Sequence, residues 1–280
     1  MTYRFVAYVS IATCVGAAGS HLQVRVAAQA STTATSTAYV PPRTPDGQPR
    51  IQGVWQSAGG SYSLEDLELQ VIYQQNQRDE SRRGKSRIVD PPTGKIPYQP
   101  WAAALAKKYF DAHTDPPSPQ LLDPVARCIV HGVPRAMFQE EYEIFQSPGY
   151  VAFVHAPVHQ YRIVPLDGRP ALGKGIQLYM GDSRGRWDGN TLVIESSNYT
   201  NKTWLDIVGS FHTDAVRFTE RLTPVSPDRI DYQVTVEDPK AYTRPWTIAA
   251  VLSRIPEEGR EVWEQACHEG ERDTQLMLRR

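Results

Sequence analysis

Two histidines lie four residues apart in the segment His155-Ala156-Pro157-Val158-His159. Pro157 and the β-rich flanks disfavour the helix on which such a pair binds zinc in metalloproteases, and the glutamate of that motif is absent. If residues 156–158 form a three-residue turn, we expect the two imidazoles to face each other across a hairpin. Three interpretations stay open: hydrogen-bonded histidines at a strand end, a shared polar site for proton transfer, or two metal ligands completed from elsewhere.

Glu220 interrupts the pattern of a predicted strand. Over residues 216–222, Val216, Phe218 and Leu222 occupy one face, and Glu220 has the same parity. A carboxylate on an apolar face is either paired or titrates near neutral pH. Glu220 is therefore a candidate general acid or base, and the alternative is a structural ion pair with an Arg or Lys on a neighbouring strand.

Arginines near two predicted turns are candidates for substrate binding. Arg162 precedes the tight turn Asp167-Gly168-Arg169. Guanidinium groups held on a turn can bind a carboxylate or sugar hydroxyls. The alternative for Arg169 is a simple ion pair with Asp167.

Residues 181–190 (GDSRGRWDGN) carry Asp182, Arg184 and Trp187. The segment is too polar for a core strand and lacks the ending of a phosphate loop. It is either a surface hairpin tip or the rim of a ligand pocket, where Trp187 would stack on the ligand.

Cysteines occur at positions 14, 128 and 267, and Cys14 lies in an N-terminal segment that we expect to be removed on export. Cys128 and Cys267 are then expected to form one disulfide, with two unpaired thiols as the alternative. Such a disulfide would hold His268 rigidly on the last predicted strand. A rigid histidine suits general acid/base catalysis and equally suits a plain core residue.

From residue 150 onward the hydrophobic period is two. Residues 230–237 alternate apolar and polar side chains, and residues 216–223 are their predicted hairpin partner. A second hairpin turns at residues 187–190 into a strand at 191–195. About eight or nine short strands joined by Gly, Pro and Asp turns predict a mainly β fold, an antiparallel β-barrel or sandwich. The further strands are expected at 150–155, 159–165, 175–180, 246–253 and 261–268.

The chain before residue 150 is less regular. Residues 101–113 (WAAALAKKYFDAH) predict a helix, and residues 64–77 are a weaker helical candidate. We expect residues 51–280 to form a single β-rich domain, in which 51–149 are an irregular, partly helical N-terminal packing segment.

The N-terminus has the features of a secretory signal peptide, residues 1–30: Arg4, an apolar run over 5–19, and small residues at Ala28 and Ala30. Cleavage near Ala30 would place the protein in the periplasm or outside the cell. Residues 31–50, rich in Ser, Thr, Pro and Gly, predict a flexible linker.

Composition and absent motifs narrow the function. The 280 residues include 30 Lys plus Arg against 31 Asp plus Glu. This leaves no basic surplus for nucleic acid, and no run of about 18 apolar residues predicts a membrane span. No dinucleotide fingerprint or metal-spaced cysteine cluster occurs, so we predict no cofactor and assign no metal. The expected partner is a small-molecule ligand or substrate.

Several short segments spread over nearly the whole mature chain resemble, as a set, a family of exported bacterial proteins, a domain of unknown function. The resemblance implies a lipocalin-like antiparallel barrel and brings no activity with it. Relatives often carry an acid beside the first histidine, where this chain has Ala156, and this departure weakens the metal interpretation. The segments are 90–94 (DPPTG), 96–98 (IPY), 132–135 (GVPR), 163–170 (IVPLDGRP), 181–193 (GDSRGRWDGNTLV), 238–239 (DP), 244–246 (RPW) and 266–270 (ACHEG).

Two functions of different classes follow. One is an exported β-barrel enzyme of isomerase, lyase or hydrolase type, acting on a small organic or hydroxylated substrate by acid–base chemistry. The other is a periplasmic binding or carrier protein without catalysis. In the enzyme, the catalytic residues would be His155, His159, Asp182, Glu220 and His268, and the substrate-binding residues Arg162, Asp167, Arg169, Arg184 and Trp187.

Overall fold

The structure is a computed structural model, and it describes residues 39–57, 63–65, 86–139, 141–156, 158, 160–173, 175–256, 262–263 and 267. The predicted signal peptide, residues 31–38 of the linker, His159, His268, most of the strand expected at 261–268 and all but the first two residues of the helical candidate at 64–77 lie outside these residues.

The elements in chain order are β1 (Gly53–Ser57), β2 (Ile88–Asp90), α2 (Pro100–Ala112), η2 (Pro119–Leu121), η3 (Pro124–Arg127), η4 (Arg135–Met137), β3 (Glu141–Ser147), β4 (Tyr150–His155), β5 (Tyr161–Pro165), β6 (Asp182–Asp188), β7 (Thr191–Ser197), β8 (Arg217–Ser226), β9 (Arg229–Glu237) and β10 (Trp246–Arg254).

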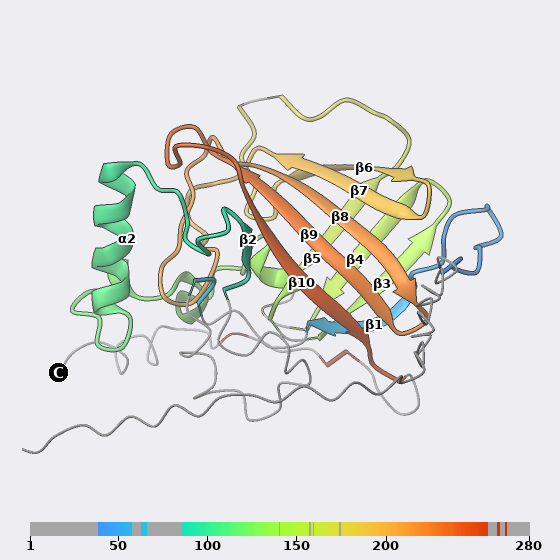
Figure 1. Cartoon of the computed structure of the whole chain (residues 1–280), viewed down its shortest axis with the longest axis horizontal. Helices are drawn as coiled ribbons and strands as arrows, with labels where there is room; N and C mark the ends of the chain where they lie inside the picture. The colour runs from blue at the N-terminus through green and yellow to red at the C-terminus, as the bar shows by residue number, and fades with distance from the viewer. Residues whose placement is uncertain are drawn as a thin grey trace, which may run out of the picture. The chain divides into compact units, whose positions relative to one another are not determined.

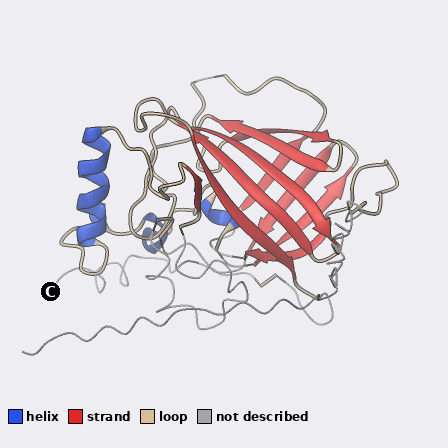
Figure 2. Ribbon diagram, in the orientation of Figure 1, coloured by secondary structure: helices blue, strands red, loops and turns tan. Residues whose placement is uncertain are grey.

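The strands form one antiparallel sheet that curls into a nearly closed barrel (Figure 1, Figure 2). Its order is β5-β4-β3-β1-β10-β9-β8-β7-β6, and β2 pairs with β10. The two end strands, β5 and β6, also lie close to each other. The Arg162 Nε on β5 donates a hydrogen bond to the Ser183 Oγ on β6 at 2.9 Å. The predicted antiparallel barrel is therefore confirmed.

Alternation of side chains explains the central hairpin. On β8 and β9 every second residue is buried, and the inward set includes Phe218, Leu222, Tyr232 and Val234. Burying one apolar face fixes the register, because a slip of one residue would turn that face to solvent. β10 continues this face and pairs with β9 along eight residue pairs.

Most predicted elements agree with the structure. The helix expected at 101–113 is α2, and the strands expected at 150–155, 159–165 and 246–253 are β4, β5 and β10. The strand expected at 175–180 is wrong. These residues are mostly exposed and belong to the connection from β5 to β6, where Leu178 makes only an isolated bridge with Tyr199.

The polar segment 181–190 contains a strand as well as a turn. Residues 182–188 form β6, and a two-residue turn at Gly189-Asn190 leads into β7. A polar strand is tolerated here because β6 is an end strand of the sheet whose outer face meets solvent. At the start of β6, Gly181 has φ +68°, and a Cβ there would overlap the Tyr199 ring, so only glycine fits.

One end of the barrel is closed by two segments that are largely buried, residues 131–138 and 199–212. Phe138 packs on Tyr232 with ring centroids 5.8 Å apart, and Tyr199 packs on Phe218 at 5.0 Å. The helix α2 lies at this end of the barrel (Figure 1) and packs against the second segment through Tyr109.

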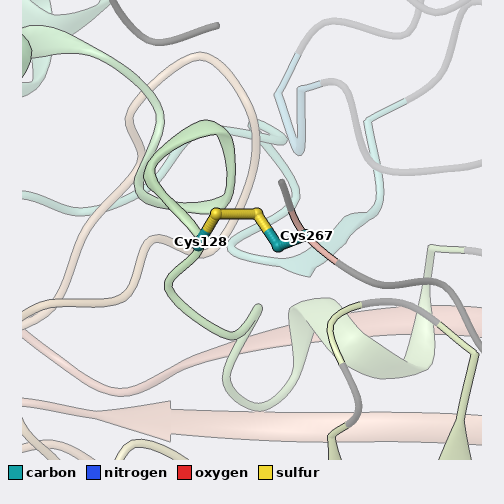
Figure 3. Close-up of a disulfide and its surroundings, with 2 residues drawn as sticks. All are labelled: Cys128 and Cys267. Carbon is teal, nitrogen blue, oxygen red and sulfur yellow. A yellow bond between two sulfur atoms is a disulfide. The ribbon is translucent and has the colours of Figure 1, made fainter. Parts of the chain in front are cut away.

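A disulfide joins Cys128, which follows η3, to Cys267 near the C-terminus, with Cα atoms 5.6 Å apart (Figure 3). The predicted pairing is therefore present. Disulfides persist in oxidising compartments, so this bond is compatible with export.

No helix among the described residues is long and apolar enough to cross a membrane.

Asp206 anchors the closing segment from a fully buried position. Its carboxylate accepts hydrogen bonds from the Leu64 amide (3.0 Å), the Ser210 amide (2.8 Å) and the Ser210 hydroxyl (2.7 Å). Burial raises the pKa of Asp206 to about 6, and these hydrogen bonds only partly oppose the shift.

This raised pKa predicts a pH dependence of stability. The unfolded chain loses the Asp206 proton near the ordinary pKa of about 4, whereas the folded protein keeps it until about pH 6. The contribution of Asp206 to the free energy of unfolding is therefore fully present below pH 4. It decreases by about 3 kcal/mol as the pH rises to 6. We expect the free energy of unfolding of the wild type, minus that of Asp206→Asn, to fall by this amount between pH 4 and pH 7. Urea titrations at several pH values measure it, and a constant difference would contradict the assignment.

Candidate functional site

A buried ion pair crosses the barrel interior. Arg162 on β5 and Glu220 on β8 are 3% and 0% exposed, and the Arg162 Nη1 donates to the Glu220 Oε1 at 3.0 Å while Nη2 meets Oε2. The Tyr232 hydroxyl donates to the same Oε1 at 2.6 Å. Burial by itself would lower the pKa of Arg162, but the Glu220 charge and hydrogen bonds raise it above its ordinary value, so Arg162 stays cationic.

This arrangement agrees with the structural alternative for Glu220, in which the carboxylate forms an ion pair with an Arg or Lys. The carboxylate is paired and enclosed, and neither of the two cavities described below has Glu220 in its lining. Arg162, considered above for substrate binding, has its guanidinium committed to Glu220 and Ser183. The barrel end above the pair is covered by the closing segments.

His155 also points into the barrel and is 3% exposed. Its ring lies 5.1 Å from that of Tyr142, and neither ring nitrogen makes a hydrogen bond of good geometry to a described residue. Burial, with the Arg162 charge, lowers its pKa to about 3, and the Ala136 carbonyl opposes this only in part. His155 is therefore neutral at physiological pH.

The expected opposition of His155 and His159 is wrong in its register. Within the β4–β5 hairpin, Val154 pairs with Tyr161, and the His155 amide donates to the Gln160 carbonyl at 3.0 Å. Gln160 therefore occupies the position opposite His155, because the loop is one residue longer than the three-residue turn assumed.

Asp182 and Arg184 hold the connection between β5 and β6. They pair at 2.5 Å, and the Asp182 carboxylate accepts from the Leu172 amide at 2.6 Å. Arg184 donates to the carbonyls of Arg169 and Pro170. Both residues thus position a loop.

The other predicted binding residues lie apart from the ion pair. Asp167 and Arg169 form an exposed pair, and the hydrogen bonds from Arg169 lower the pKa of Asp167 to about 2. Arg169 also lies over the Tyr150 ring, 5.3 Å from its centroid. Trp187 donates to the Gln48 side chain at 3.1 Å and packs partly against the core.

The larger of two described cavities, about 670 Å³ in volume, lies beside the loop that Asp182 and Arg184 hold. It is bounded by this loop, the end of β7, the start of β8 and the end of β9. Its lining residues are Ala171, Leu172, Gln177, Ser197, Asn198, Asp214, Ala215, Val216, Arg217, Glu237 and Pro239. We call it the loop cavity. The other cavity, near Trp55 and Arg254, has about 210 Å³.

The loop cavity is preformed by hydrogen bonds between its walls. The Asn198 amide donates to the carbonyls of Leu172 (3.1 Å) and Gly173 (3.3 Å), and the Leu178 amide donates to the Asn198 carbonyl at 2.8 Å. Asn198 has φ +60°, a backbone conformation that asparagine tolerates better than most residues. These hydrogen bonds therefore hold the loop at two places, Leu172–Gly173 and Leu178, against Asn198.

The charges around the loop cavity are nearly balanced. Asp214 pairs with Lys240 at 2.8 Å, and this hydrogen bond lowers the pKa of Asp214. Arg217 and Glu237 stand opposite each other in the β8–β9 register.

The sequence-based prediction did not find the loop cavity. The available signal was the run of apolar residues that predicted a strand at 175–180. Leu172, Ile176, Leu178 and Tyr179 in this connection are each about 40–50% exposed, and of these four Leu172 lines the cavity.

Within the described part of the chain, no group of three or more potential metal ligands comes together. A search of protein-family models finds no match to this chain. A search of curated proteins also finds no match. The resemblance to exported bacterial proteins stays a prediction.

Proposed function

We propose that this protein is an exported binding or carrier protein that holds a small organic molecule in the loop cavity. The observation that carries the proposal is the cavity itself, because about 670 Å³ falls within the roughly 300–1,000 Å³ range of ligand sites. The cavity near Trp55, at about 210 Å³, falls below it.

The lining favours a ligand with an apolar body and a few hydrogen-bonding groups. Leu172, Val216 and Pro239 supply apolar surface, while Gln177 and Arg217 supply donors. Because the loop is held by Asp182, Arg184 and Asn198, little ordering accompanies binding, and this preorganisation favours affinity.

Binding is preferred over acid–base catalysis because the described candidates for catalysis, His155, Asp182 and Glu220, lie outside the cavity lining. Glu220 and His155 are enclosed in the barrel, and Asp182 supports the loop from outside the cavity lining. A general base must reach the proton it abstracts.

Titration with N-phenyl-1-naphthylamine, a neutral fluorescent probe, tests this proposal. We expect saturable binding of about one probe per chain, and we expect Ala215→Trp to raise Kd at least tenfold, because the indole fills part of the cavity. Ala104→Trp, on the exposed face of α2, is the matched control and should bind like the wild type.

Circular dichroism should show the same fold for both variants. Binding unchanged in Ala215→Trp, or no saturable binding of either this probe or the anionic anilinonaphthalene sulfonate, would count against a ligand site in the loop cavity.

A further inference from the structure

The outer face of β3, β4 and β5 carries a group of large apolar residues, unlike the outer face of β6 to β9. Phe145, Tyr150, Val154, Tyr161 and Ile163 point outward and are between 36% and 66% exposed. We call this surface the apolar face. It lies across the barrel from β8 and β9 in Figure 1.

The outer face of β6 to β9 provides the contrast. Charged side chains cover it, and several are paired across strands, as Arg186 with Glu195 and Arg221 with Asp188. A sheet in contact with water is expected to carry such polar residues along its whole outer surface. The apolar face therefore differs from an ordinary solvent-exposed sheet surface, and this difference indicates a binding surface.

The strand register makes the apolar face continuous. Ala152 is the Cα partner of both Phe145 and Ile163, and Val154 is the partner of Tyr161 on β5 and of Glu143 on β3. The small Ala152 side chain thus lies between large apolar ones, and Glu143 and Ser147 on β3 stand at one border of the face. With about 150–250 Å² for a large side chain, the exposed fractions amount to roughly 450 Å² of apolar surface.

We propose that the apolar face binds a second copy of this chain, giving a two-fold symmetric dimer. A standard interface takes about 800 Å² from each partner, of which about 56–65% is apolar. The roughly 450 Å² of the apolar face is close to this apolar part of an interface. A two-fold axis through this face would set it against the same face of the other copy, as an isologous interface requires.

Polar groups border the apolar face, as they do at the rim of ordinary interfaces. Ser147 stands beside Tyr150 in the register, and the Asp167–Arg169 pair lies over the Tyr150 ring. These groups keep their water contacts while the centre is buried.

Sedimentation equilibrium from about 1 to 100 µM tests the proposal. We expect the wild type to be dimeric at the upper end, and Ile163→Lys and Tyr161→Lys to weaken dimerisation at least tenfold, because each buries a charge at the interface. Val225→Lys is the matched control. Val225 on β8 is 38% exposed outside the apolar face, so its variant should dimerise like the wild type.

Unchanged probe binding and melting temperature in Ile163→Lys would show that the variant is folded and that the dimer is independent of the loop cavity. A wild type that stays monomeric to 100 µM would overturn the proposal, as would dimers that survive both lysine variants. A monomer that instead sediments with phosphatidylethanolamine–phosphatidylglycerol vesicles would overturn it in favour of a lipid surface.

Discussion

Glu220→Gln is expected to lower the free energy of unfolding by about 3–5 kcal/mol, because it leaves the Arg162 guanidinium charged and unpaired inside the barrel. For a domain of this size, the midpoint of thermal unfolding should fall by about 10 °C. The loss of the Tyr232 hydrogen bond to a carboxylate adds to the effect. Differential scanning calorimetry measures it.

Two further variants separate the buried pair from a general charge effect. Glu195→Gln removes the carboxylate of an exposed pair with Arg186, whose side chains are 61% and 59% exposed, and should cost less than about 1 kcal/mol. The double variant Arg162→Met/Glu220→Leu should recover much of the lost stability, because it removes both charges together. A Glu220→Gln protein that melts within 2 °C of the wild type, roughly 1 kcal/mol or less, would instead support the catalytic interpretation of Glu220.

Replacing both Cys128 and Cys267 by Ser is expected to cost about 4–5 kcal/mol in the chain-entropy model. The bond closes a loop across a sequence separation of 139 residues, so its removal greatly enlarges the freedom of the unfolded chain. Urea unfolding of the oxidised wild type and of the double variant measures the difference.

Reduction of the wild type is the control for this prediction. With dithiothreitol present, the wild type and the double serine variant should unfold at nearly the same urea concentration. A double variant as stable as the oxidised wild type would show that the disulfide contributes little.

The sequence was most informative where one face of a strand is buried. Strict alternation over residues 230–237 and 216–222 identified the β8–β9 hairpin, and the same parity identified Glu220 as inward-facing before its partner was known. The partner itself could not be predicted, because Arg162 lies on β5 and reaches Glu220 only when the sheet curls.

Other features depend on contacts that no local pattern records. β1 and β3, which lie within residues 51–149, have short alternating runs among prolines and were not predicted as strands. The loop cavity joins a loop to the ends of three strands that are distant in sequence. The apolar residues at 175–180 in this loop followed strand propensity, although they face solvent instead of a partner strand.

A ligand site in the loop cavity is tested most directly with a crystal of the protein soaked with a bromine-labelled naphthylamine. Anomalous scattering locates the bromine without any assumption about the natural ligand. We expect one bromine peak in the loop cavity, between Leu172 and Ala215, and an unchanged Arg162–Glu220 pair. A peak inside the barrel beside Glu220 and His155 would contradict it, because the interior would then be a binding site open to small molecules.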